Sequence, residues 1–168
     1  MKHHAFTIIA TGLDHEADDF EDRFFAAGCD DATIAFARGA IILEFDRDAR
    51  NFSHAIQSAI SDVRAAGAQI IRVEPDHLVN LSDIAERSGL TRAAVSLYAK
   101  GSRGADFPAP VARVTSDSPL WDWVDVAKWL RTRRQVSTED VVQARVVKRA
   151  NLGLGRRGCW ASKRPQLP

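Results

Sequence analysis

The sequence LSDIAERSGLTRAAVSLYAKG at residues 81–101 decides how the second half of the chain folds. Ser82 is a good helix N-cap, and acidic residues follow it in the first turn, where carboxylates favour the positive end of the helix dipole. Gly89 can adopt the left-handed conformation that a sharp turn between helices requires. Thr91 then caps a second helix over RAAVSLYAK. The stretch therefore predicts two helices that meet at Gly89.

The spacing of small and apolar residues in this stretch is that of a helix-turn-helix. A small residue lies where the two helices would cross, a glycine follows four residues later, and apolar residues lie six and nine positions after that glycine. A generic helical hairpin also satisfies the pattern. The residues expected to face inward are Ile84, Ala85, Leu90, Val95 and Tyr98.

The next segment predicts a wing and a third helix. FPAPVARV at 107–114 should be extended, because its two prolines exclude helix locally. TSDS at 115–118 should turn the chain, and PLWDW should return as a strand into the amphipathic helix VDVAKWL. We expect Trp121, Trp123 and Trp129 to pack the wing and the last helix onto the first two helices rather than to stack on bases.

Residues 79–131 resemble the winged helix-turn-helix of the MerR and excisionase (AlpA-like) DNA-binding superfamily. The motifs IA…GLTRAAVSLY and PLWDWVDVAKWL carry the resemblance. It implies that the second helix lies in the major groove of double-stranded DNA, with its N-terminal residues near base edges. The chain lacks the long dimerising coiled coil and the effector-binding cysteines of the MerR sensors, so a metal-sensing role does not follow.

The resemblance also implies a set of DNA contacts. Arg92 can pair bidentately with guanine, and Ala93 can touch a thymine methyl group. Tyr98 and Lys100 are expected to reach phosphates and fix the register, while two arginines of the wing region reach the backbone or the minor groove. For each arginine the alternative is a solvated surface cation. The complete expected set is Thr91, Arg92, Ala93, Ser96, Tyr98, Lys100, Arg103 and Arg113.

The first 77 residues predict a separate α/β module. Apolar and β-branched runs predict strands over 4–12, 31–39, 40–48 and 68–75, the middle two meeting in a tight hairpin near Arg38–Gly39–Ala40. Helices are expected around Phe20, Phe24 and Phe25, ending at Gly28, and over 54–67 with Asn51 or Ser53 as cap. The order β-α-β-β-α-β is that of a ferredoxin-like sandwich.

No enzyme motif stands out in this module. A dense run of acids could suggest a metal-dependent nuclease, but it falls at the start of a helix and on its solvent face, where carboxylates favour the dipole. No nucleophile motif of the G-x-S-x-G type and no phosphate-cradling loop occurs. We therefore expect no catalytic residues, no cofactor and no bound metal. The acids are Asp14, Glu16, Asp18, Asp19, Glu21 and Asp22.

The C-terminal segment predicts a helix and then a basic tail. Ser137 or Thr138 caps the helix, whose apolar side could dock on a partner or a dimer mate. GLGRRG at 153–158 matches G-x-G-x-x-G, but a dinucleotide site needs a preceding strand and a following helix, so that interpretation is rejected. A flexible basic tail or a disordered terminus is expected instead. The apolar side comprises Val141, Val142, Ala144, Val146 and Val147.

Charge is distributed unevenly along the chain. Residues 1–80 carry a net charge of −7, residues 81–134 carry +3 and residues 135–168 carry +5, which together give the formal +1 of the whole chain. A basic half can meet a polyanion, although mixed charges can also simply keep surfaces soluble. Cys29 and Cys159 lack the paired spacing of a zinc site or a disulfide framework. The absence of a long apolar run or a secretory signal favours a cytoplasmic protein without a membrane partner.

Together these patterns predict an α+β chain with three parts: an acidic module at 1–77, a winged helix-turn-helix at 78–134, and a helix with a basic flexible tail at 135–168. The leading hypothesis is a homodimeric, sequence-specific DNA-binding transcriptional regulator, a repressor or antitoxin-like autoregulator. Its first module would dimerise or bind a small ligand or a protein partner. The alternatives are an architectural, excisionase-like DNA-bending protein and a protein-interaction adaptor.

Overall fold

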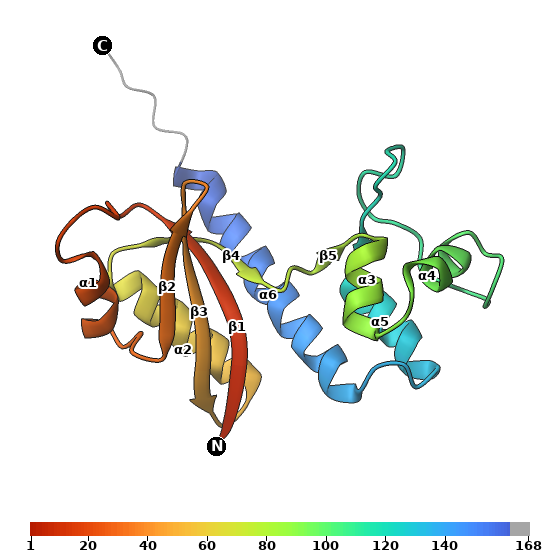
Figure 1. The fold of residues 1–168 in the computed structure, drawn as a ribbon, viewed down its shortest axis with the longest axis horizontal. Coiled ribbons are helices and arrows are strands. Elements are labelled where there is room, and N and C mark those ends of the chain that lie inside the picture. The colour runs from red at the N-terminus through yellow and green to blue at the C-terminus, as the bar shows by residue number, and fades with distance from the viewer. Residues whose placement is uncertain (162–168) are drawn as a thin grey trace, which may run out of the picture. The chain divides into compact units, whose positions relative to one another are not determined.

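The computed structural model describes residues 1–161, with side chains as far as residue 155, and shows an α+β chain (Figure 1). Contacts divide it into two compact units, Met1–Pro75 with Arg149–Pro168, and Asp76–Lys148. The sequence was divided near the same first boundary, but its third part is shared between the units. Helix α6 (Thr138–Ala161) begins in the second unit and ends in the first.

Unit 1 is built on a four-stranded antiparallel sheet with strand order β2-β3-β1-β4 (Figure 1). Helix α2 packs against β1, β3 and β4. The order strand, helix, strand, strand, helix, strand confirms the predicted order. The elements are β1 (Lys2–Thr11), α1 (Phe20–Ala26), β2 (Ala32–Ala37), β3 (Ala40–Ala49), α2 (Phe52–Ala65) and β4 (Gln69–Glu74).

Alternation along the strands creates the core of unit 1. Every second residue of β1 and β3 is buried, as expected for a sheet with one face covered. In α1, Phe20 and Phe24 are buried, whereas Phe25 is 68% exposed. Because Phe24 already fills the inward position, its neighbour points about 100° away around the helix.

The β2–β3 hairpin turns over two residues, as predicted. Arg38 and Gly39 both have positive φ, 53° and 79°, and Ala37 pairs with Ala40 across them. Two consecutive positive φ values are the signature of the tight turn whose twist matches that of the flanking strands. The loop therefore fixes the register of β2.

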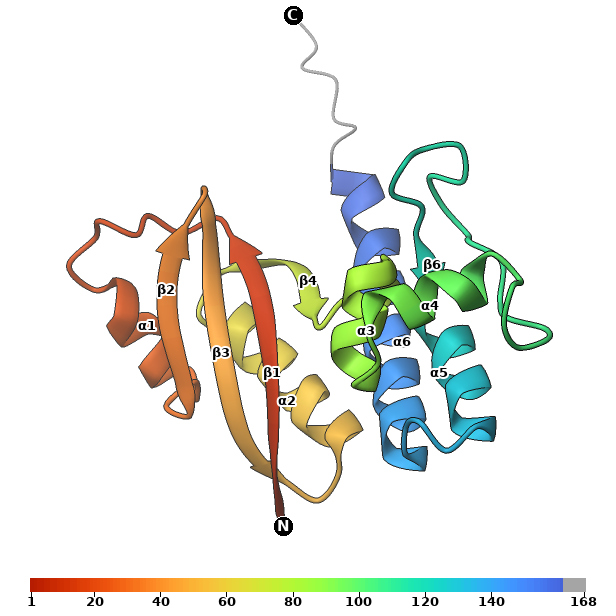
Figure 2. The ribbon, with the colours of Figure 1, turned by 45° about the vertical axis from the view of Figure 1, so that its right-hand side comes forward.

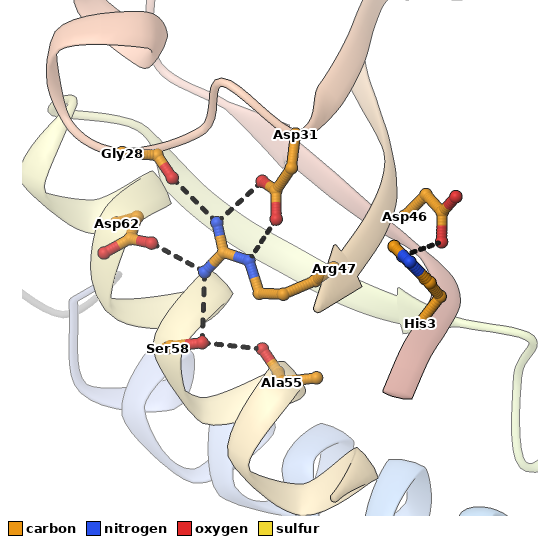
Figure 3. Close-up of polar contacts among 8 residues, drawn as sticks. All are labelled: His3, Gly28, Asp31, Asp46, Arg47, Ala55, Ser58 and Asp62. Carbon is orange, nitrogen blue, oxygen red and sulfur yellow. Dashed lines mark hydrogen bonds and ion pairs between the residues drawn. The ribbon is translucent and has the colours of Figure 1, made fainter. Parts of the chain in front are cut away.

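A buried arginine joins three segments of unit 1 (Figure 3). Arg47 continues the inward-facing series of β3, and its guanidinium makes two hydrogen bonds to Asp31, at 2.7 and 2.9 Å. Further bonds reach Asp62 at 2.6 Å, the Ser58 hydroxyl at 3.1 Å and the Gly28 carbonyl at 2.7 Å. All five donors are thereby used. The hydrogen bonds to the Asp31 carboxylate are the largest influence on the pKa of Arg47, and they raise it above its ordinary value.

The thiol of Cys29 lies beside this arginine network and is 2% exposed. Burial, reinforced by the nearby Asp62 carboxylate, raises the pKa of Cys29 from 9.0 to about 11. The thiol is therefore neutral near pH 7. The raised pKa contributes stability that is fully present below about pH 9 and is lost as the pH rises through about 11.

This protection makes alkylation of Cys29 slow in the folded chain. In a Cys159→Ser variant Cys29 is the only thiol. At pH 8 its thiolate fraction should be about 100-fold lower when folded than when unfolded, because the pKa differs by about two units. Iodoacetamide labelling should be at least that much slower without urea than in urea. Equal rates would show that the thiol is not protected.

Unit 2 combines helices with a small antiparallel sheet (Figure 2). Strand β5 pairs with β6, with Val79 opposite Trp121. This pairing was not predicted, because β5 has only two residues and carries no periodic pattern. The elements are β5 (Leu78–Val79), α3 (Leu81–Ser88), α4 (Arg92–Ala99), β6 (Trp121–Asp122), α5 (Trp123–Thr132) and the first part of α6.

The predicted wing is reduced to its smallest form. Instead of a strand over 107–114, a single bridge joins Ala112 to Leu120. The backbone N–H of Leu120 donates to the Ala112 carbonyl at 2.9 Å. Strand β6, which follows Leu120, pairs with β5 instead. The prolines explain the difference, since they remove the donors that a longer ladder would need.

The helix caps agree with the sequence in three cases and differ in one. Asn51 caps α2 by accepting from His54 N–H at 2.9 Å. Thr91 caps α4 by accepting from Ala94 N–H, and Ser137 caps α6 by accepting from Asp140 N–H, both at 3.1 Å. Ser82 was predicted to cap α3, but Asn80 does so, accepting from the N–H groups of Ser82 and Asp83. The carboxylate of Asp83 accepts from Asn80 N–H in return. This reciprocal capping box satisfies more donors than a serine cap at position 82 would.

Helix α6 differs from the predicted helix with a flexible tail. It continues to Ala161, so the G-x-G-x-x-G match lies inside a helix, and residues 162–168 lie outside the described residues. Most of its predicted apolar side is used within the chain: Val141 and Ala144 belong to the core of unit 2 and Val147 is buried, whereas Val142 is 43% exposed. Lys148 Nζ donates to the buried Asp122 carboxylate, which also caps α5 through Val124 N–H.

Within residues 1–161, no helix has both the length and the apolar character that crossing a bilayer would require.

Candidate nucleic-acid interface

A cluster of aromatic rings holds α4 in place. Tyr98 of α4 meets Trp129 of α5 at a centroid distance of 4.9 Å, and Phe107 lies 4.9 Å from the same indole. The indole N–H of Trp129 donates to the Ala105 carbonyl at 2.9 Å, while Trp121 donates to Pro108 at 3.0 Å. The tryptophans are buried, as predicted. They fix both the helix and the chain that follows it.

A glycine makes the close approach around these rings possible. Gly104 has a φ of +74°, and a Cβ there would lie 3.1 Å from Trp129 and 3.2 Å from Tyr98. Any side chain would therefore be strained and would also push against two rings. The loop after α4 is thereby held close to the aromatic cluster.

Helices α3 and α4 meet through a left-handed glycine, as predicted. Gly89 has φ 70° and ψ 12°, and the Ser88 hydroxyl donates to the Ile84 carbonyl at 2.6 Å. Ile84 and Val95 are fully buried between the helices. The inward positions were predicted correctly, except that Leu90 is only partly buried.

This packing leaves one side of α4 exposed. Val95 and Tyr98 face the core, and the opposite side presents a row with helical spacing in which Ser96 is half-buried and the others are exposed. Two of these residues are cationic, one at each end of the helix. We call this surface the outer face of α4; it comprises Arg92, Ala93, Ser96, Leu97 and Lys100.

Arg92 is held by the neighbouring helix. Its Nε donates to the Ser82 hydroxyl of α3 at 3.1 Å. Its two terminal nitrogens donate to no other residue in the part of the chain that the structure describes. Arg92 also lines an open depression together with Asn80, Leu81, Ser82, Asp117, Ser118 and Pro119. The guanidinium fork is thus oriented but available.

Arg113 is exposed in the turn between Ala112 and Leu120. Arg113 has a φ of 53°, and its carbonyl accepts from both the backbone and the hydroxyl of Ser116. The turn between Ala112 and Leu120 is therefore closed by its own hydrogen bonds. Val114, next to Arg113, is 62% exposed. The turn brings Asp117 beside Arg92 at the same depression.

Three predicted DNA-binding residues make contacts within the protein. Tyr98 is 9% exposed and lies in the aromatic core, so it is not part of the outer face of α4. Arg103 is exposed in the following loop, where its guanidinium lies 5.6 Å from the Tyr98 ring. Thr91 is exposed, and its hydroxyl already caps α4.

The sequence reasoning missed two residues of this surface. Ser82 was assigned to capping, but it contacts Arg92 instead. Leu97 is 43% exposed, although it is large and apolar. Its position four residues after Ala93 was the available signal, because residues with that spacing share one side of a helix.

Among the described residues, no cluster of three or more His, Cys, Asp or Glu side chains is arranged to hold a metal ion. The acidic residues before and within α1 are all exposed, and Asp19 pairs with Arg23 at 2.8 Å. These carboxylates therefore lie in solvent, as their placement at a helix start predicted.

No protein-family model, curated protein or solved structure matches this chain.

Proposed function

We propose that this protein is a cytoplasmic, sequence-specific DNA-binding transcriptional regulator, either a repressor or an antitoxin-like autoregulator, that acts as a homodimer on double-stranded DNA. In this proposal α3, α4 and the wing form a winged helix-turn-helix of the MerR and excisionase kind, and unit 1 is a ferredoxin-like module. The observation that carries the proposal is the outer face of α4, which presents Arg92, Ser96 and Lys100 on a helix whose other side is packed into the core.

Four of the five residues of the outer face have chemistry suited to DNA. The free nitrogens of Arg92 match the O6 and N7 acceptors of guanine, and the methyl group of Ala93 matches that of thymine. Ser96 can donate to or accept from a base edge. Lys100 at the end of α4 reaches phosphate. Tyr98 acts by packing, and the exposed Thr91, Arg103 and Arg113 supply backbone contacts on either side.

The charge balance supports the same proposal. Residues 81–134 carry a net charge of +3, and the acids of the first 80 residues outnumber their bases. Cations that neutralise phosphates release counterions, which is the main source of affinity in sequence-independent DNA contacts. A basic region around α4 and the wing is therefore where a polyanion would bind.

A protein-interaction adaptor is the second candidate, and one observation favours it. Leu97, Val111 and Val114 are large apolar side chains, 43%, 55% and 62% exposed, on α4 and the wing. Large exposed apolar side chains are typical of protein interfaces where they form a contiguous patch. An architectural, excisionase-like role would use the same α4 but would bend the DNA, which gel assays with phased sites would reveal.

Selection of genomic DNA fragments by the purified full chain tests the proposal. The wild type should recover a defined motif, whereas recovery without any sequence preference would contradict regulation. Arg92→Ala should lose about 1–3 kcal/mol of specific affinity and relax the motif at one base pair.

Two further variants make this result interpretable. Arg145→Ala removes one positive charge from an exposed site of α6 in unit 2 and should leave the motif unchanged. Lys100→Ala should weaken binding to all sequences alike and reduce the dependence on salt by about one phosphate contact. A motif that survives Arg92→Ala intact would remove Arg92 from base reading.

A further inference from the structure

The two edges of the unit 1 sheet are treated differently. At the β4 edge, the side-chain amide of Asn151 accepts from Val73 N–H at 2.8 Å and donates to the Val73 carbonyl at 2.9 Å. Asn151 is 9% exposed, so these bonds are shielded from water. One amide thereby satisfies both backbone groups that a further strand would have bonded. The β4 edge is closed at that point.

Among the described residues, no side chain bonds the β2 edge in the same way. Ala37 and Ala40 flank the two-residue turn, so they form a hydrogen-bonded pair. Along an antiparallel ladder, hydrogen-bonded pairs alternate with non-hydrogen-bonded pairs, whose backbone groups point away from the partner strand. The backbone groups of Ala32, Ile34 and Phe36 therefore point away from β3. Ala32 N–H is used locally, donating to the Cys29 carbonyl. The N–H and carbonyl groups of Ile34 and Phe36 have no partner among the described residues.

The sequence of β2 also lacks the features that usually protect an edge strand. Its six residues, ATIAFA, contain no charged residue and no proline. Its pairing with β3 runs without a bulge. Natural sheets blunt free edges with charges, prolines or bulges, because a regular uncharged edge is a template for another strand. The β2 edge is therefore complementary to a β-strand.

We propose that β2 pairs antiparallel with β2 of a second copy of this chain, about a twofold axis at Ala35, to form a continuous eight-stranded sheet. In this register Ile34 of each copy bonds to Phe36 of the other through both N–H and carbonyl groups. Ala35 then lies directly opposite its own counterpart. The proposal depends on the dimeric state in the proposed function but not on DNA binding.

A second copy fits this edge better than an unrelated strand because the side chains are self-complementary. Ile34 and Phe36 pair with Leu43 and Ile41 of β3, both buried, so they lie on the helix-covered side of the sheet. Phe36 is 40% exposed there. Across the twofold axis each Phe36 would meet an Ile34, and aromatic pairs with β-branched residues are among the favourable cross-strand contacts.

Charge near the edge gives the association a characteristic response to salt. His15 stacks on Phe36 at a centroid distance of 3.7 Å, which places the acids Asp14 and Glu16 close to the end of β2. Two copies would bring these acids toward each other. Dimerisation should therefore strengthen as salt screens the repulsion, whereas DNA binding should weaken with salt.

Sedimentation equilibrium of the full chain without DNA tests the proposal. The wild type should be a dimer, and Ala35→Lys should weaken the association at least tenfold, because two like charges would face each other. Ala5→Lys is the matched control: Ala5 is exposed on the same open face but in the interior strand β1, and the variant should stay dimeric. A monomeric wild type, or a dimer unaffected by Ala35→Lys, would overturn the proposal.

A cysteine cross-link tests the register. Directly opposite residues outside the hydrogen-bonded pairs have Cα atoms about 4.5 Å apart, within reach of a disulfide. In a Cys159→Ser background, Ala35→Cys should oxidise to a covalent dimer and Ala5→Cys should not. Equal cross-linking of both variants contradicts the proposed seam. Because neither measurement uses DNA, a failure here leaves the DNA-binding proposal standing, and failed DNA selection leaves the dimer result standing.

Discussion

Replacing Arg47 by methionine should lower the free energy of unfolding by roughly 3 kcal/mol, near the low end of the 3–5 kcal/mol expected when one partner of a buried ion pair is removed. The low end applies because the side chains of Asp31 and Asp62 are each 28% exposed, so water partly compensates them. Methionine fills a similar space and leaves both carboxylates without their cation. Urea unfolding followed by circular dichroism measures the change.

Two comparisons isolate the cause. Arg50→Met makes the same substitution at an exposed arginine just after β3 and should change stability by less than about 0.5 kcal/mol. Asp31→Asn should destabilise the wild type, which loses an ion pair, but should stabilise the Arg47→Met variant, which loses an uncompensated charge. The same sign in both backgrounds would contradict the proposed coupling.

Replacing Asn151 by leucine should cost roughly 2–6 kcal/mol, because Val73 N–H and the Val73 carbonyl would both be buried without partners at about 1–3 kcal/mol each. Leucine is a better helix former than asparagine and has a similar size. Any loss of stability is therefore due to the hydrogen bonds rather than to helix propensity. Urea unfolding measures the total, and hydrogen exchange at Val73 measures the local effect.

The control for this substitution is Arg149, two residues before Asn151 in α6. Arg149→Leu changes an exposed residue of the same helix and should leave both stability and Val73 exchange nearly unchanged. In Asn151→Leu, exchange at Val73 should accelerate more than at Val63, which is hydrogen-bonded within α2. Uniform acceleration at both sites would mean that the amide does not protect the β4 edge specifically.

These two residues show where sequence reasoning reached its limit. The order of elements in unit 1, the β2–β3 turn and the inward tryptophans all follow from local patterns, and the structure confirms them. Arg47 had a local signal, since it shares the parity of Ile41, Leu43 and Phe45 and so had to be buried. The hydrogen-bond partners of Arg47 could not be predicted from the local sequence.

In the candidate interface, too, some features follow from the local sequence and others depend on tertiary packing. Thr91 as a cap, Gly89 as the turn and the buried Val95 are consequences of short-range spacing. The position of Tyr98 in the core and the contact of Ser82 with Arg92 depend on how α4 lies against α3 and α5. A helical wheel gives the side of a helix on which a residue lies, but not which residue of another element packs against that side.

The sequence by itself therefore determined the order of elements in unit 1, the two helices that meet at Gly89, the two-residue turn and the acidic and basic halves, because propensity, capping and charge are properties of neighbouring residues. The tertiary structure alone decided that β6 pairs with β5, that α6 is shared by two units, and that Asn151 closes the edge at Val73, 78 positions away. Those contacts join chemically ordinary residues across the chain. Only the packed fold selects the partner of each, because many other residues offer the same donors and acceptors.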